Sequence, residues 1–87
     1  MKKSVYADAI GRLQDHTPTA ARAVRYAVAY HARENRWPTT TDLIRDRVID
    51  KSEVTNTLAT AMLQGWVLSY PQVRSIRWFI TDEGRSI

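Results

Sequence analysis

The stretch that most constrains the fold is 50–65, DKSEVTNTLATAMLQG, because it predicts a helix with a defined start and a defined end. Asp50 and Glu53 fit a capping box, in which each side chain accepts a hydrogen bond from the backbone N–H of the other residue. Gly65 supplies the left-handed conformation that commonly ends a helix, and a β-prone run follows at once. The stretch therefore predicts a helix over residues 51–64.

The predicted helix has two unlike faces when residues are placed at about 100° intervals. Val54, Leu58, Ala61 and Gly65 fall on one side and are expected to pack against the rest of the chain. The opposite side is expected to be presented to a partner. It carries Ser52, Glu53, Asn56, Thr60 and Leu63.

Composition narrows the class of protein. Eighty-seven residues with 44% apolar content predict one domain over residues 1–87 with a single modest core. The chain has no cysteine and only two histidines, so we expect no disulfide, no metal site and no cofactor. The start of the chain is polar and no long apolar run follows, which predicts a cytoplasmic protein without membrane contact.

Two helices are predicted ahead of the central stretch. Residues 4–15 carry apolar side chains at near-helical spacing and predict a short amphipathic helix. Thr17 and Pro18 fit a cap followed by proline at the first helical position, so a longer helix should cover residues 18–35. Its outer side carries an arginine stripe, which is either solvated or contacts phosphate. The stripe consists of Arg22, Arg25, Arg33 and Arg36.

The link after the long helix contains a second capping pattern. Trp37 precedes Pro38 and is therefore pushed towards extended geometry, which ends the helix and favours a short strand. Thr39 and Asp42 then fit a hydroxyl cap with a carboxylate three residues later. We expect a third helix over residues 40–47.

The remaining pattern completes a mainly α fold with a small β-hairpin. Residues 48–49 predict a tight turn that places the helix over 51–64 across the preceding helix, in helix-turn-helix order. Residues 66–70 and 76–80 are β-prone runs at hairpin spacing. A last capped turn is expected to begin at Thr81. On the second strand, alternation assigns Ile76, Trp78 and Ile80 to the core side and Arg77 and Phe79 to the outer side.

These motifs, in this order, resemble the core of MarR-type winged-helix transcriptional regulators. The resemblance covers residues 17–85. It is carried by DKSEVT at 50–55, GWV at 65–67, RSI at 74–76 and ITDEGR at 80–85. The segment WPTT at 37–40 also resembles the entry to the helix-turn-helix of LexA-type DNA-binding domains.

The resemblance implies a winged helix-turn-helix core over residues 17–85, preceded by an N-terminal helix in residues 1–16. It implies that the helix over 51–64 enters the major groove of duplex DNA and that the wing over 66–80 lies near the minor groove. By position, the expected DNA contacts are Lys51, Ser52, Glu53, Thr55, Asn56, Thr60, Arg74 and Arg77. The implied function is transcriptional regulation, and the N-terminal helix either mediates a homodimer or packs on the core.

Catalysis is not expected, because the three glycines are isolated and no nucleophile with a base is evident. Two non-catalytic functions fit the sequence. The net charge of +4 favours a polyanion such as DNA. The second function is that of a protein-interaction module, which is favoured because the presented helix face has no basic residue after Lys51.

Overall fold

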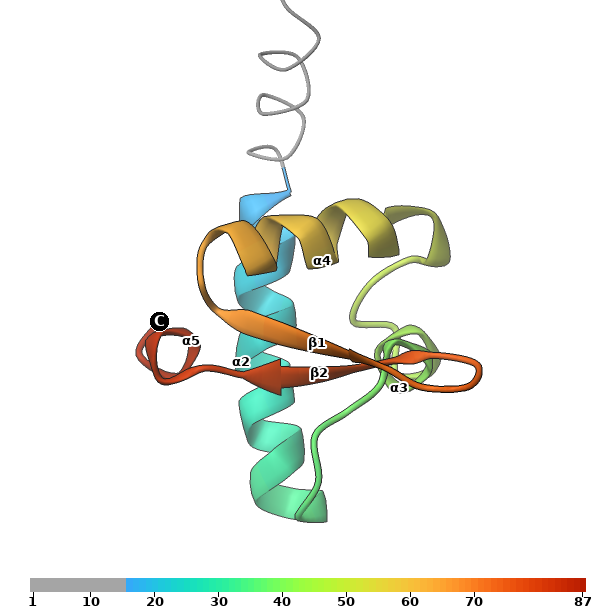
Figure 1. The fold of residues 1–87 in the computed structure, drawn as a ribbon, viewed down its shortest axis with the longest axis horizontal. Coiled ribbons are helices and arrows are strands. Elements are labelled where there is room, and N and C mark those ends of the chain that lie inside the picture. Colours follow the sequence, from blue (N-terminus) through green and yellow to red (C-terminus); the bar gives the residue numbers. More distant parts are fainter. Residues whose placement is uncertain (1–15) are drawn as a thin grey trace, which may run out of the picture.

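The computed structural model describes residues 16–87. Most of its elements are helices, and its two strands form one antiparallel hairpin (Figure 1), which confirms the predicted mainly α fold with a small hairpin. The helix expected over residues 4–15 lies outside the described residues. The elements are α2 (Thr17–Glu34), α3 (Thr40–Arg45), the 3-10 turn η1 (Lys51–Glu53), α4 (Val54–Leu63), β1 (Val67–Pro71), β2 (Ile76–Ile80) and α5 (Asp82–Arg85).

Helix α2 is the long helix that the sequence predicted, and it buries a face of small apolar residues and Tyr30. The predicted Thr17 cap is wrong, because Thr17 is itself helical and the preceding His16 makes no side-chain capping bond. The helix ends at Glu34. The next residue, Asn35, still donates its N–H to the carbonyl of His31, and its left-handed φ of 57° then turns the chain out of the helix.

Helix α3 begins with the predicted capping box. The Thr39 side chain accepts from the Asp42 N–H, and the Asp42 carboxylate accepts from the Thr39 N–H. The helix is two residues shorter than predicted. Arg47 has a φ of 60°, through which a right-handed helix cannot continue. The turn lies at 46–47, two residues earlier than predicted, and residues 48–49 form a buried bend after it.

The central stretch begins differently from its prediction. Asp50 makes no side-chain capping bond, and the N–H of Glu53 is taken by the backbone carbonyl of Asp50 at 2.9 Å. Lys51–Glu53 therefore forms a 3-10 turn, and the predicted capping box is wrong. The end of the helix is as predicted, because Gly65 has a φ of 77°.

The packing side of α4 is wider than the sequence suggested. Leu58 and Ala61 are buried and Val54 is partly buried, which confirms these three predictions. Thr60, however, is only 2% exposed, so its assignment to the presented face is wrong. The reason is that α4 packs against both α2 and β1, and two neighbours cover a broader arc than one.

The hairpin has the predicted alternation of buried and exposed residues. Val67 pairs with Ile80 and Leu68 with Phe79, and Trp78 and Ile80 are buried while Phe79 is exposed. The short strand expected near Pro38 is reduced to an isolated bridge between Thr39 and Arg77.

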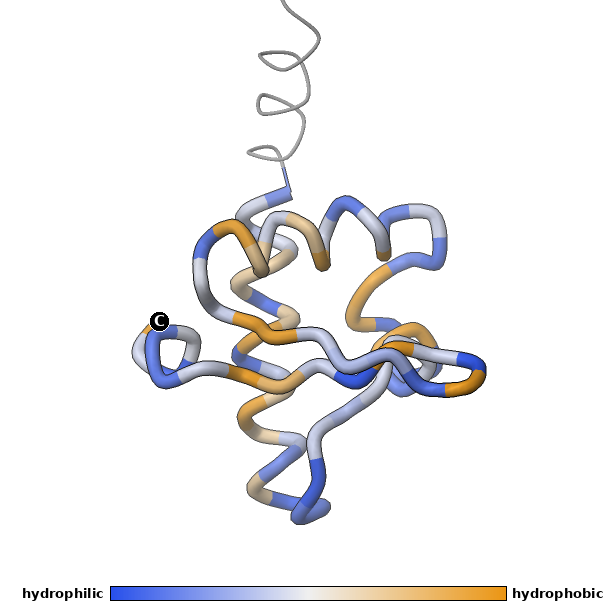
Figure 2. The backbone as a smooth tube through the Cα atoms, viewed as in Figure 1, coloured by the Kyte–Doolittle hydropathy of each residue, from blue (hydrophilic) through white to orange (hydrophobic). Residues whose placement is uncertain are grey.

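The core lies where α2, α4 and the inner side of the hairpin meet. Figure 2 shows apolar segments along these elements, and the two largest fully buried side chains are Trp78 and Leu43. In Figure 1, α4 crosses α2, the hairpin loop reaches α3, and α5 lies at the other end of the hairpin. Helix α5 has the predicted Thr81 cap. The hairpin loop and the start of the central stretch thus lie close to α3.

Candidate functional site

A shallow groove of about 490 Å3 lies between the start of α3, the start of the central stretch and the hairpin loop. Its apolar lining includes Ile44, Val54 and Ile76. Its polar lining includes Thr40, Thr41, Lys51, Arg74 and Ser75.

Hydrogen bonds between α3 and the hairpin hold the two sides of the groove together. The Thr41 N–H and hydroxyl both donate to the Ser75 hydroxyl oxygen, at 3.1 and 3.0 Å. The Thr40 hydroxyl donates to the carbonyl of Ile76 and accepts from Trp78 Nε1 at 2.9 Å. These bonds fix the hairpin loop on α3, and with it the backbone from which Arg74 projects.

Lys51 and Arg74 bring two positive charges to this groove from separate elements. Both residues are exposed, and among the described residues no carboxylate lines the groove. The groove lining therefore carries two positive charges, and hydroxyl groups lie beside them. Such a surface attracts an anion such as a phosphate.

Four of the other predicted contacts lie just after Lys51 and are fully or partly exposed. Ser52, Thr55 and Asn56 are exposed, and Glu53 is half-exposed. Ser52 and Glu53 belong to η1, whereas Thr55 and Asn56 belong to the first turn of α4. The structure thus places these four polar residues next to the groove, on either side of Val54, which lines it.

Two predicted contacts are engaged within the fold. The Thr60 hydroxyl donates to the carbonyl of Asn56 at 2.8 Å, so this buried group is not presented to a partner. Arg77 is half-buried, and its Nη1 donates to the carbonyl of Trp37 at 2.5 Å. Arg77 consequently joins β2 to the link after α2 and lies outside the groove lining.

Three of the four arginines in the predicted stripe make contacts within the fold, and one of these, Arg36, lies beyond the end of α2. Arg22 Nη2 donates to the carbonyl of Val48 at 2.8 Å and so ties α2 to the turn after α3. Arg33 and Arg36 lie over the Tyr30 ring, at 5.4 and 5.2 Å from its centroid. These contacts within the fold are a third use of the stripe, beside the solvation and phosphate contact that the sequence suggested.

Asp42 organises the charges that hold α3. Its carboxylate lies 2.9 Å from Arg45 Nη1 and 3.5 Å from Arg36 Nη1. Burial by itself raises the pKa of Asp42, but the hydrogen bonds with Thr39 and the two arginines outweigh burial, so the net pKa is lowered.

A second contact network ties α2 to the end of α3. Tyr26 donates a short hydrogen bond to Asp46, and this bond, followed by burial, raises the pKa of the Tyr26 phenol. Asp46 also pairs with Arg45 at 3.1 Å, and these two bonds lower the pKa of Asp46. Helix α3 is therefore anchored from both of its ends.

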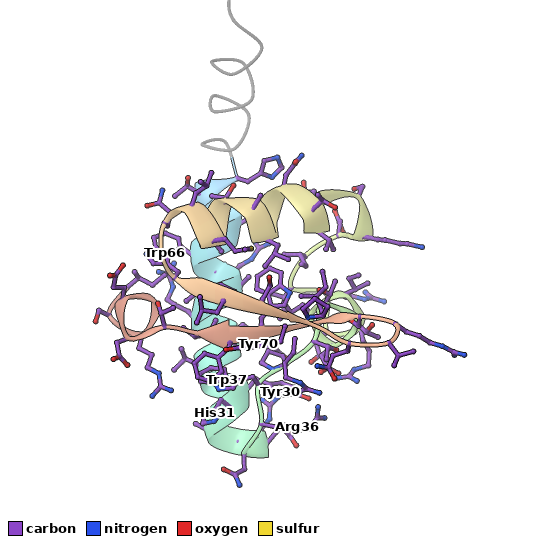
Figure 3. All side chains as sticks on the ribbon, viewed as in Figure 1. Tyr30, His31, Arg36, Trp37, Trp66 and Tyr70 are labelled. Atoms are coloured by element: carbon purple, nitrogen blue, oxygen red, sulfur yellow. The ribbon has the colours of Figure 1, made fainter. Side chains whose placement is uncertain are left out.

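The aromatic residues around the end of α2 are a feature that the sequence reasoning missed. Figure 3 shows Tyr30, His31, Arg36 and Trp37 close together in this region. The His31 and Trp37 rings are stacked with centroids 4.1 Å apart. The aromatic residues of this cluster are spread over positions 30–79, so the sequence did not indicate that they meet. The only indication was the strand alternation, which set Phe79 on the outer side of β2.

No protein-family model, curated protein or solved structure matches this chain. Within residues 16–87, no helix is long and apolar enough to cross a membrane. In the same range, no group of three or more histidine, aspartate or glutamate side chains is arranged to hold a metal ion.

Proposed function

We propose that the chain is a winged helix-turn-helix domain that binds duplex DNA and regulates transcription. The observation that carries this proposal is the groove shared by Lys51 and Arg74, which joins the exposed start of the central stretch to the hairpin loop. A helix for the major groove and a loop for the adjacent backbone are the two parts that such a domain needs. The order of the elements, helix, helix, turn, helix and hairpin, supports the same proposal.

In this proposal the segment from Ser52 to Asn56 faces the bases. Asn56 is exposed in the first turn of α4, and an asparagine amide can form two hydrogen bonds with adenine. The Ser52 and Thr55 hydroxyls, also exposed, donate to phosphates and fix the register. Glu53 is half-exposed, and its negative charge repels phosphates. It therefore disfavours positions of the helix in which Glu53 would lie against the DNA backbone.

The cations that hold the DNA backbone are Lys51 and Arg74, which line the same groove next to the base-reading segment. Between Ser52 and Gly65 there is no basic residue, so phosphate attraction has to come from the flanking groups. Arg77, bonded to the carbonyl of Trp37, contributes by holding the hairpin in place. The chain acts by binding alone, without catalysis or a cofactor, and works in the cytoplasm.

A homodimer would set two such helices about one turn of DNA apart, roughly 34–36 Å, for symmetric half-sites. In this proposal residues 1–16 supply the dimer contact, because their sequence carries Tyr6, Ile10 and Leu13 in an apolar stripe. Light scattering of the full chain should then give the mass of a dimer, and a monomer mass at micromolar concentration contradicts this part of the proposal.

The site is tested by selecting a preferred duplex from random sequence and titrating it with variants. Asn56→Ala should weaken the free energy of binding to the preferred duplex by about 1–3 kcal/mol and should change binding to random DNA little. Arg74→Ala should weaken binding to both duplexes similarly, because a phosphate contact does not read sequence. Arg25→Ala is the matched control, since Arg25 is an exposed arginine outside the groove. Equal losses for Arg25→Ala and Arg74→Ala contradict the assigned site.

A protein-interaction module is the second candidate function, and it is favoured by the far end of α4. Met62 is 45% exposed and Leu63 is 71% exposed there, which is apolar surface of the kind that protein partners cover. If Leu63→Ala abolishes capture of a protein from cell extract while no duplex binds to micromolar protein, this second function replaces the first.

A further inference from the structure

The outer side of the hairpin carries exposed aromatic and apolar residues that the proposed duplex site does not use. Leu68 and Tyr70 on β1 are each 50% exposed, and Phe79 on β2 is 38% exposed. Leu68 pairs with Phe79, and Tyr70 pairs with Arg77, so all four side chains lie on one side of the strands. We define these four residues as the hairpin outer face. The groove of the proposed duplex site uses different residues of the hairpin, including Ile76 and Arg74.

The exposed rings are held in place by further rings behind them. Tyr70 meets Phe79 edge-on, with centroids 6.1 Å apart and planes at 79°. Phe79 in turn contacts Trp37, with centroids 5.4 Å apart, and Trp37 is stacked on His31. Trp37 is only 8% exposed, so it supports Phe79 from below. Tyr70 and Phe79 are therefore pre-positioned and lose little conformational freedom when a partner stacks on them.

Two arginines lie beside this group of rings. Arg77 belongs to the outer face and is fixed by its bond to the Trp37 carbonyl. The exposed Arg85 lies with its Cζ atom 5.2 Å from the Trp37 ring centroid. The nearest acidic residues along the chain, Asp82 and Glu83, precede Arg85 on α5, at one end of the hairpin. The outer face itself has no carboxylate, and its net charge is positive.

We propose that the hairpin outer face binds unpaired bases of a single-stranded nucleic acid. Exposed aromatic rings beside cations are the combination that single-strand-binding surfaces use, because each base stacks on a ring while the phosphates meet the positive charge. Stacking requires only the face of a base, so this surface accepts single strands of varied sequence. Tyr70 and Phe79 hold the bases and Arg85 meets the phosphates, while Arg77, whose Nη1 donates to the Trp37 carbonyl, adds positive charge beside the rings. This second site is independent of the duplex site.

The test uses a fluorescent oligothymidylate of about ten nucleotides, within the range of known single-strand sites, and an oligouridylate of equal length. Tyr70→Leu keeps an apolar side chain and removes the ring, so it should weaken binding roughly 5- to 100-fold. Tyr70→Phe keeps the ring and should retain most of the affinity. Phe79→Leu should weaken binding similarly, and a thermal melt of each variant shows whether the fold is kept. Comparison of the two oligonucleotides tells whether the surface prefers DNA or RNA.

The duplex variants separate this proposal from the first. Arg74→Ala should leave single-strand affinity nearly unchanged, and Tyr70→Leu should leave duplex affinity nearly unchanged. The proposal is overturned if neither oligonucleotide binds at about 100 µM protein, the weak end of non-specific nucleic-acid affinity. It is also overturned if Tyr70→Leu and wild type bind the single strands equally. The proposal is overturned as well if the hairpin outer face is found to mediate self-association, or to bind an acidic peptide, in place of single strands.

Discussion

Replacing Asp42 with asparagine should lower the stability of the fold in a pH-dependent way. In wild type the Thr39 nitrogen lies 2.9 Å from a carboxylate oxygen of Asp42. An asparagine oxygen at position 42 can still accept a hydrogen bond from the Thr39 N–H, so the cap is retained without its charge. A hydrogen bond to a charged group is worth about 1 kcal/mol more than a neutral one. The ion pairs with Arg45 and Arg36 add only a few tenths of a kcal/mol each, because both arginine side chains are more than half exposed. We therefore expect a loss of about 1–2 kcal/mol at pH 7.

The pH dependence follows from the lowered pKa of Asp42 in the folded chain. A carboxylate with a lowered folded pKa stabilises the fold fully above its unfolded pKa of about 3.9, and this contribution is lost as the pH falls through the folded pKa. The difference between wild type and Asp42→Asn should thus be constant from pH 7 to about pH 5 and should shrink towards pH 3.

Urea unfolding, followed by tryptophan fluorescence, measures this difference at each pH. The buried Trp78 should report the loss of the core. Asp50→Asn is the matched control, because Asp50 is exposed and makes no capping bond, so its substitution should change stability by less than about 0.5 kcal/mol. Equal effects of the two substitutions, or an undiminished difference for Asp42→Asn at pH 3, contradict a stabilising role for the ionised Asp42 carboxylate.

Three further substitutions test the packing. Leu58→Ala, at a buried position of α4, should cost about 2–5 kcal/mol, and an unchanged urea midpoint shows that α4 is wrongly oriented. Thr40→Val removes the partner of the buried Trp78 Nε1 and should cost about 1–3 kcal/mol, whereas Thr40→Ser should restore the melting temperature if that bond is the cause. Gly84→Ala places a Cβ 2.4 Å from the carbonyl oxygen of Trp66 and should cost at least about 1 kcal/mol; a melting temperature equal to wild type rules out this close approach.

Local residue chemistry predicted most of the elements. The Thr39–Asp42 box, the Gly65 helix end and the strand alternation each depend on residues a few positions apart, and each is present in the structure. The same capping pattern failed at Asp50, although its residue types are suitable. There the backbone carbonyl of Asp50 takes the Glu53 N–H, so the first turn is a 3-10 turn that leaves no role for the side chain.

The candidate site was only partly predictable, because its geometry depends on long-range contacts. Helical periodicity could not show that α4 is covered from two sides, which is why Thr60 was wrongly assigned to the surface. Strand alternation set Arg77 on the outer side but could not show its bond to a carbonyl forty positions earlier. The groove shared by Lys51 and Arg74 depends on how the hairpin loop folds back onto α3.

The salt dependence of duplex binding tests the proposed function most directly. The affinity of wild type for random duplex DNA should fall between about 50 and 200 mM salt, with a slope of log affinity against log salt of about −0.9 per neutralised phosphate. Lys51→Ala and Arg74→Ala should each reduce the magnitude of the slope by about one, and the double variant by about two. Absence of binding by micromolar protein at the lower salt, or an unchanged slope in the double variant, contradicts the proposal that this groove holds DNA.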